Sequence, residues 1–250
     1  MKVLMRAALL AIVPMTVLLA QDATPAPAPP AVSDAAVARM RTQLMDWAQL
    51  DRYKAANATL GTSGMTGRVV FYGDSITDAW VSNGGEFFPG KPYINRGISG
   101  QTTPQMVVRF RQDVINLHPA AVVILAGTND IAGNTGPETP EMIEDNFRTM
   151  ADLAKANGIK VIFASILPVA DYPWKPGLKP ALKIQALNNW LAGYSVNHSI
   201  TYLDYYTAMA DENGGMKPGI SLDGVHPNAK GYAIMQPLAQ AAVDKAIGPR

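Results

Sequence analysis

The sequence predicts a parallel α/β domain in which helices cover both faces of one sheet. Short apolar runs rich in β-branched residues alternate along the chain with longer segments, where apolar residues recur every three or four positions. A chain of 250 residues is long enough to bury a full core, and one such domain is the natural expectation for its length. Together these observations predict a sheet of five strands with helices between them.

The predicted strands are short runs with the composition of buried β-structure. The first ends abruptly at the tripeptide Gly-Asp-Ser, and the third is an unbroken apolar stretch that ends at Gly-Thr-Asn-Asp. The predicted strands cover residues 69–72, 92–95, 120–126, 159–166 and 200–203.

The helices are predicted from capping residues and from their apolar spacing. Thr103-Pro104 and Thr139-Pro140 each place a hydroxyl side chain before a proline, which is typical of a helix start. The last helix is expected to begin near Asn228. An early helix is predicted from Asp34, and its apolar face comprises Val37, Met40, Leu44 and Trp47.

The N-terminus has the pattern of a secretory signal peptide. Lys2 and Arg6 precede the apolar run 7–20, after which the chain becomes polar. The alternative, a retained membrane anchor, is weaker because the run is short for a bilayer and Pro14 interrupts it. We therefore expect residues 1–20 to be removed and the protein to be secreted or periplasmic, with no stable membrane anchor after cleavage.

The next segment, residues 21–33, alternates alanine and proline with almost no charge. Such a stretch cannot form a core and behaves as an extended linker. A single domain is therefore expected over residues 34–250.

Composition excludes several classes of function. The formal net charge is +1, so no electrostatic signature of nucleic-acid binding is present. The chain has no cysteine, which removes disulfides, thiolate zinc sites, a cysteine nucleophile and a lipidated cysteine. Neither an H-E-x-x-H pattern nor a G-x-G-x-x-G pattern after the first strand is found. No metal or other cofactor is expected, and oligomeric state is not predicted.

Ser75 is a candidate nucleophile because it follows the first predicted strand at a tight turn into a helix. There its hydroxyl stands clear of the sheet, and its N–H lies at a helix N-terminus, where negative charge is favoured. The alternative is that Gly-Asp-Ser is only a turn, since all three residue types favour turns.

A serine nucleophile needs a base, and the chain has three histidines. His118 and His198 lie at predicted helix ends, where histidine is usually structural. Asp223 precedes His226 by three residues, so its carboxylate can bind Nδ1–H and leave Nε2 for the serine hydroxyl. The alternative is that Asp-Gly-Val-His-Pro is a capped helix start.

Attack by serine creates an oxyanion that needs preorganised donors. The candidates are the backbone N–H groups of Ser75 and Gly100 and the side-chain amide of Asn129. For Asn129 the alternative is an Asx-turn that closes the loop. Asp74 and Asp130 are interpreted as carboxylates that fix their loops. In a parallel sheet these groups would meet beyond the carboxyl ends of the strands.

Taken together and in this order, Gly-Asp-Ser, Arg-Gly-Ile-Ser-Gly, Gly-Thr-Asn-Asp and Asp-Gly-Val-His resemble the SGNH (GDSL) hydrolase family from Arg68 to the C-terminus. The resemblance implies a flavodoxin-like, five-stranded parallel sheet in a three-layer α/β/α arrangement, no metal, and an acyl-enzyme mechanism. The spacing is more similar to platelet-activating-factor acetylhydrolase-like and bacterial acetylesterase members than to the long plant lipases.

The resemblance also implies a role for each candidate. Ser75 is the nucleophile and an oxyanion donor, and Gly100 and Asn129 are the other donors. His226 is the base, and Asp223 orients it.

A secreted enzyme with no obvious lid helix favours short acyl groups, and O-acetyl groups of saccharides are the expected substrate. The alternatives are a lysophospholipase or thioesterase acting on lipid acyl groups, and a non-catalytic carbohydrate-binding module on the same fold. Aromatic candidates for the pocket could instead pack in the core. The residues expected to bind substrate are Asp74, Trp80, Tyr172, Trp174 and Val225, with Phe87 and Phe88 as further candidates.

Overall fold

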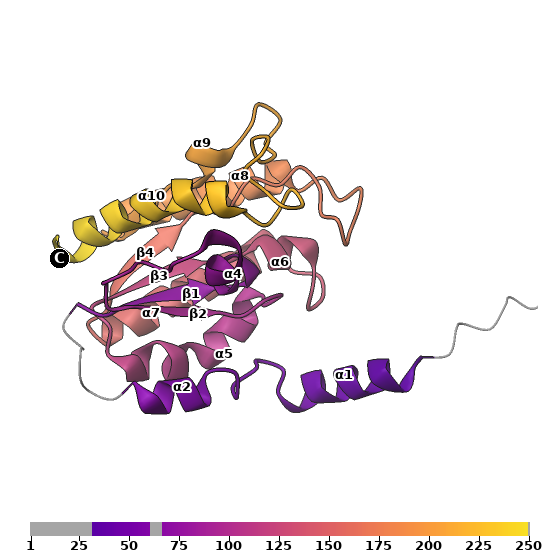
Figure 1. The fold of residues 1–250 in the computed structure, drawn as a ribbon, viewed down its shortest axis with the longest axis horizontal. Coiled ribbons are helices and arrows are strands. Elements are labelled where there is room, and N and C mark those ends of the chain that lie inside the picture. Colours follow the sequence, from indigo (N-terminus) through magenta and orange to yellow (C-terminus); the bar gives the residue numbers. More distant parts are fainter. Residues whose placement is uncertain (1–31, 61–66, 250) are drawn as a thin grey trace, which may run out of the picture.

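The computed structural model describes residues 32–60 and 67–249. The predicted signal peptide, residues 1–20, lies outside the described residues, as does the predicted linker 21–33 except for its last two residues. Five parallel strands form one sheet in the order β2-β1-β3-β4-β5, which confirms the predicted fold class (Figure 1). The strands are β1 (Val69–Gly73), β2 (Tyr93–Gly97), β3 (Ala121–Leu125), β4 (Lys160–Ala164) and β5 (Thr201–Leu203).

The helices connect the strands and cover both faces of the sheet. Before and within the first crossovers lie α1 (Asp34–Met45), α2 (Lys54–Thr59), α3 (Ser75–Asp78), α4 (Trp80–Gly84), α5 (Thr103–Asp113) and the 3-10 turn η1 (Ile115–Leu117). After β3 follow α6 (Thr128–Ala132), α7 (Pro140–Ala156), α8 (Ala181–Asn197), α9 (Tyr206–Met209) and α10 (Ala229–Ile247).

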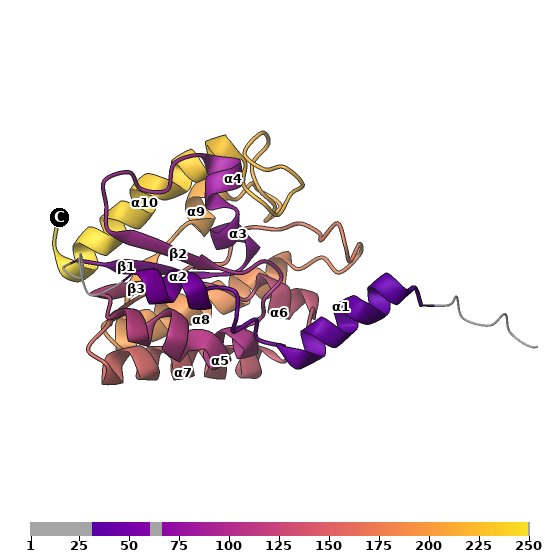
Figure 2. The same cartoon turned by 60° about the horizontal axis from the view of Figure 1, so that its bottom comes forward.

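The core is divided by the sheet into two apolar layers, because successive strand side chains point to opposite faces. Val70 and Tyr72 of β1 pack in the cluster that includes residues of α5, α7 and α8. Val69 and Phe71 pack in the other cluster, with residues of α4 and α10. Figure 2 shows α5, α7 and α8 below the sheet and α4 and α10 above it.

The strand order reverses at β1, since the chain places β2 on one side of it and β3 on the other. The last residue of β1, Gly73, is in register with Gly97 of β2 and Leu125 of β3. The loops after these three strands therefore begin at one level of the same edge. In such sheets this switch point is where ligands bind.

Two helix predictions need correction. The cap of α5 is Thr102, whose side chain forms a reciprocal capping box with Gln105, so Thr103 is the first helical residue. The predicted apolar face of α1 is exposed, with Met40 at 54% and Leu44 at 82% exposure. Helix α1 projects beyond the layers that cover the sheet, so no strand face covers it (Figures 1 and 2). Within the described residues no helix combines the length and apolar character needed to cross a membrane.

Candidate active site

Ser75 is the first residue of α3, directly after the turn that ends β1. Asp74 caps this helix, and its Oδ1 accepts a hydrogen bond from the Ile76 N–H at 2.9 Å. The turn fits tightly against its neighbours, because a Cβ on Gly97 of β2 would lie 2.1 Å from the Asp78 nitrogen of α3. Glycine at this position lets the short helix cross the end of β2 and places Ser75 at the switch point.

The structure brings Ser75, His226 and Asp223 together in one chain of hydrogen bonds. The Ser75 Oγ lies 2.9 Å from His226 Nε2, although 151 residues separate the two in the sequence. On the other side of the ring, His226 Nδ1 lies 2.8 Å from Asp223 Oδ2. A carboxylate only accepts, so Nδ1 carries the proton and Nε2 accepts from the serine hydroxyl.

The loop that carries His226 is held by its own side chains. Asp223 Oδ1 accepts from the N–H groups of Val225 and His226 at 3.0 and 2.8 Å. Ser221 Oγ accepts from the Gly224 N–H at 2.8 Å and donates to the His226 carbonyl at 3.0 Å. Burial tends to raise the pKa of Asp223, but the hydrogen bonds from His226 and Val225 outweigh burial and lower it. The carboxylate is therefore ionised at neutral pH.

Asn129 lies in the first turn of α6, at the end of β3, and is 3% exposed. Its Nδ2 donates to the Gln101 carbonyl at 2.9 Å, and its Oδ1 accepts from Asn134 Nδ2 at 2.8 Å. These two bonds determine which way the amide faces. Asn134, which the sequence analysis missed, follows five residues after Asn129 in a Gly-Asn-Thr-Gly loop, and that turn composition is the only signal for it.

Gly100 lies in the exposed loop after β2 with φ +79°, and a Cβ there would meet nothing within 4 Å. The constraint at Gly100 is thus the left-handed backbone, which glycine adopts without strain. Just before it, the Ile98 N–H donates to the Gly73 carbonyl at 3.0 Å and extends the pairing of β1 and β2 past their ends. This bond holds the Gly100 loop beside the Ser75 turn.

Arg109 of α5 is a buried cation that the sequence analysis missed. Its guanidinium donates to the carbonyls of Gly73 and Arg96 at 3.0 and 2.9 Å and pairs with Asp113 at 3.1 Å. It also lies over the Tyr72 ring, 4.1 Å from the centroid. Both charged side chains of the pair are 0% exposed. Arg109 therefore ties together the ends of β1 and β2, from which the Ser75 and Gly100 loops leave.

Two carboxyls behind the site are buried. Asp130 Oδ1 accepts from the Thr103 N–H at 2.8 Å, and burial raises its pKa. Burial raises the pKa of Asp74 to about 7, although its bond from the Ile76 N–H and the nearby His226 act in the opposite direction. Both residues hold loops, as predicted. Asp74 is 1% exposed, so the prediction that it binds substrate is wrong.

Most of the residues predicted to line the pocket are instead core residues. Trp80, at 2% exposure, packs with Phe71, Phe88 and Tyr232 beneath α10. Phe88 is 3% exposed, Val225 is 1% exposed, and Phe87 is partly buried against the same core. For Trp80, Phe88 and Val225 the prediction is wrong, because the local spacing of apolar residues does not reveal which of them the helices cover.

Tyr172 and Trp174 are adjacent rings with different roles. Tyr172 is 0% exposed, and its hydroxyl donates to the Thr128 carbonyl at 2.9 Å, so it does not line a pocket. Trp174 is 42% exposed, its ring centroid lies 6.3 Å from that of His226, and its Nε1 lies 3.3 Å from Asn134 Oδ1. Trp174 is therefore accessible to a ligand beside the site.

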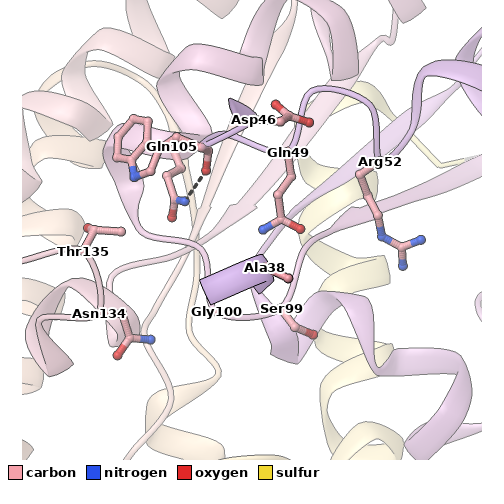
Figure 3. A pocket seen from close by; sticks show the side chains of 10 residues that line it. Ala38, Asp46, Gln49, Arg52, Ser99, Gly100, Gln105, Asn134 and Thr135 are labelled. Carbon is pink, nitrogen blue, oxygen red and sulfur yellow. Dashed lines mark hydrogen bonds between the residues drawn. The ribbon is translucent and has the colours of Figure 1, made fainter. Parts of the chain in front are cut away.

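A cavity of about 970 Å³ opens at the catalytic edge (Figure 3). One wall is the N-terminal segment from α1 to Arg52, and the other comes from the loops that follow β2 and α6 and from α5. The sequence analysis did not predict that this N-terminal segment lines a cavity. The lining residues are Ala38, Asp46, Trp47, Gln49, Arg52, Ser99, Gly100, Gln105, Asn134 and Thr135. The described residues contain no cluster of three or more histidine, aspartate or glutamate side chains suited to a metal ion.

Two similar proteins of known structure come from species of Bacteroides. A proposed acylhydrolase of Bacteroides fragilis is 46% identical, with a match that covers 80% of this chain and 98% of that one and a TM-score of 0.78. A GDSL-like lipase of Bacteroides thetaiotaomicron is 47% identical, with coverage of 80% and 99% and a TM-score of 0.77. An acetylxylan esterase of Geobacillus stearothermophilus, 17% identical over 72% of this chain and 95% of that one, shares the fold at a TM-score of 0.57.

Among curated proteins, an uncharacterised lipoprotein of Bacillus subtilis is 33% identical over 82 residues. That match covers 31% of this chain and about a third of the relative's length. The family model for the GDSL-like lipase/acylhydrolase family matches residues 71–234, which hold Ser75, Asn129, Asp223 and His226. The chain therefore belongs to the GDSL-like lipase/acylhydrolase family of carboxylic ester hydrolases.

Proposed function

We propose that the protein is a serine esterase that works through an acyl-enzyme on short-chain, chiefly acetyl, esters. The observation that carries this proposal is the continuous hydrogen-bond chain from Ser75 through His226 to Asp223. We take residues 34–250 as the single catalytic domain.

In the first step Ser75 Oγ attacks the ester carbonyl carbon, and its proton passes to His226 Nε2. Asp223 stabilises the imidazolium that forms, because its carboxylate already accepts from Nδ1. When the tetrahedral intermediate collapses, the C–O bond to the alcohol breaks, and the leaving oxygen takes the proton from Nε2. A water molecule then attacks the acyl-enzyme by the same route, which releases the acid and returns the proton to Ser75.

The oxyanion of each tetrahedral intermediate would be bound by the N–H groups of Ser75 and Gly100 and by the Asn129 amide. Within the described residues one Nδ2 hydrogen of Asn129 is used on the Gln101 carbonyl, and no second acceptor takes the other. The Ser75 N–H lies at the start of α3, where helix N–H groups have no partner inside the helix. Removing one such donor typically costs about 2.7–4 kcal/mol of transition-state stabilisation.

The substrate class we favour is an O-acetylated saccharide. The cavity beside the site is open, and seven of its ten lining residues carry polar side chains. Trp174 offers an accessible indole next to it, through its bond to Asn134. A long acyl chain would instead need an apolar channel leading to the serine. A lipid acyl hydrolase stays the alternative, and a carbohydrate-binding module without catalysis is disfavoured by the bonded Ser75, His226 and Asp223.

We also propose that the protein is exported, since residues 1–20 combine a basic start with an apolar run. The Bacillus subtilis relative is a lipoprotein, which is consistent with export.

The test is hydrolysis of 4-nitrophenyl esters from acetate to decanoate by the protein and by Ser75→Ala. We expect a preference for acetate and a loss of about 10⁴–10⁶ in kcat for the variant, as when other serine triads are broken. Ser82→Ala is the control, because Ser82 is an exposed serine of α4 whose hydroxyl, among the described residues, bonds the Ala79 carbonyl and the Asn83 side chain.

Retained activity in Ser75→Ala would contradict the proposed nucleophile. Faster cleavage of decanoate than of acetate would favour the lipid alternative, and no cleavage of any ester would favour the binding module.

A further inference from the structure

The turn from Asp46 to Arg52, hereafter the N-terminal wall, faces the candidate oxyanion loop across the cavity. Trp47, Gln49 and Arg52 line the cavity on the side of this wall, and Ser99 and Gly100 line the cavity on the opposite side. In Figure 3 the Gln49 side chain extends from the turn toward Ser99 and Gly100. The wall thus stands where the part of a substrate beyond the reacting ester would lie.

Three glutamine side chains anchor this wall to the domain. Gln105, Gln101 and Gln112 donate to the carbonyls of Trp47, Ala48 and Leu50 at 2.6, 2.8 and 2.6 Å respectively. Ala48 itself is 4% exposed. Within the turn, the two carboxylate oxygens of Asp46 accept from the N–H groups of Leu50 and Asp51. A wall held at so many points is preformed, as a binding site requires.

Gln101 joins the wall directly to the candidate oxyanion hole. Its side chain donates to the Ala48 carbonyl, while its own carbonyl accepts from Asn129 Nδ2. Gln101 is 0% exposed. One buried residue therefore sets the position of the wall relative to the Asn129 amide.

The groups of the wall that remain available suit a neutral, hydroxylated ligand. Trp47 is 44% exposed. The side-chain amide of Gln49 forms no hydrogen bond with any described residue, whereas the Gln49 backbone N–H donates to the Asp46 carbonyl within the turn. The lining charges of Asp46 and Arg52 offset each other, and Arg52 also pairs with Asp78 at 3.4 Å. An indole offers an apolar face to the C–H groups of a sugar ring, and an amide can both donate to and accept from hydroxyls.

We propose that the N-terminal wall forms the subsite for the sugar residues that carry the ester, with Trp47 as a stacking surface and Gln49 as a hydrogen-bonding group. This inference rests on the proposed esterase function and assigns its specificity to a segment outside the family match at residues 71–234. The cavity of about 970 Å³ is at the upper end of the range of about 300–1,000 Å³ for small-molecule sites, far more than an acetyl group fills. Trp174, bonded to Asn134 of the opposite wall, would border the same sugar chain.

The experiment compares two acetates, acetylated xylo-oligosaccharide and 4-nitrophenyl acetate, which share the acyl group and differ in the alcohol. The readout is the ratio of kcat/KM for the saccharide ester to kcat/KM for the nitrophenyl ester. We expect Trp47→Ala to lower this ratio about tenfold, mostly through KM, and Gln49→Ala to lower it about threefold. Trp47→Phe keeps an aromatic face and should retain most of the ratio.

Met45→Ala is the matched control, because Met45 is the last residue of α1, directly before the N-terminal wall, and is an apolar residue at 82% exposure that does not line the cavity. Its ratio should equal that of the wild type. Thermal unfolding of each variant shows whether the turn is intact.

A ratio unchanged in Trp47→Ala, or equal losses on both esters in a folded variant, overturns the inference. Cleavage of 4-nitrophenyl acetate by the wild type without cleavage of the saccharide ester also overturns it, yet leaves the esterase proposal standing. Failure to cleave either ester contradicts the proposed function itself.

Discussion

The two halves of the candidate site are built in opposite ways. The base side is a single loop in which His226 and Asp223 are three residues apart, with side chains 23% and 38% exposed. The oxyanion side joins Asn129, Gln101 and Arg109, which are 3%, 0% and 0% exposed and come from separate segments. A residue of the first half can therefore be changed without disturbing the core, whereas a change in the second half affects activity and stability together.

The largest effect should come from Asp223→Asn on the base side. Asparagine keeps an oxygen for the Val225 and His226 N–H groups, but its amide donates toward Nδ1 and favours the wrong tautomer of His226. We expect kcat to fall about 10⁴-fold, the size of the effect in a serine triad of known mechanism. Thermal unfolding should be nearly unchanged, because the side chain is partly exposed. A kcat within tenfold of the wild type would remove Asp223 from its proposed role.

The next effect is on stability, in Arg109→Met on the buried side. The variant leaves Asp113 buried without its cation, so we expect the free energy of unfolding to fall by about 3–5 kcal/mol. Arg148→Met is the matched control, because Arg148 also pairs with an acid four residues away, Glu144, but is 38% exposed. Its loss should stay within about 1 kcal/mol. Urea unfolding of both variants measures the difference, and equal losses would refute the contrast between buried and exposed groups.

Asn129→Ala tests whether the buried half couples activity to stability. We expect kcat to fall about 10²–10³-fold through the lost oxyanion donor. The Gln101 carbonyl also loses its bond, so the free energy of unfolding should fall by about 1–3 kcal/mol. Asn134→Ala, which removes the group that holds the Asn129 oxygen and the acceptor of the Trp174 indole but keeps the Asn129 amide, should reduce kcat less. Loss of stability in Asn129→Ala with full activity would limit Asn129 to a structural role.

The smallest effect concerns pH, and here the buried carboxyl behind the site, Asp74, and the base-side carboxyl, Asp223, should differ in sign. Burial raises the pKa of Asp74 to about 7, so its contribution to stability is present below its ordinary pKa and is lost as the pH rises through about 7. The pKa of Asp223 is lowered, so its contribution is present at neutral pH and is lost as the pH falls.

Asp74→Asn keeps an acceptor for the Ile76 N–H but cannot ionise. Relative to the wild type, Asp74→Asn should become more stable as the pH rises from 4 to 8. Asp223→Asn should become slightly less stable than the wild type as the pH rises out of the acidic range, because only the wild type then has the ionised carboxylate. Urea unfolding across this pH range measures both. Parallel curves for wild type and Asp74→Asn would show that Asp74 does not titrate as inferred.

Features that depend on neighbours in the chain were predictable. The five strands were predicted within a few residues, and Thr139 caps α7 through a bond to the Met142 N–H, as its place before Pro140 indicates. The spacing of Asp223 and His226 predicted their bond, because three residues of one loop bring both side chains within reach. The order of the sequence motifs predicted the family, which the family model confirms.

Features that depend on which helix faces pack against the sheet, and on which distant segments meet, were decided by the tertiary structure. The spacing of α1 predicts a buried face, yet no layer of the sheet covers it, and Trp80 is equally apolar but lies beneath α10. The Gln101 and Gln105 contacts to the N-terminal wall join residues more than 50 positions apart. The sequence by itself therefore determined the elements and the base loop, because their interactions are local. Only the folded chain decided the N-terminal wall and the buried support of Asn129, because long-range packing determines which polar groups lose water and must find partners.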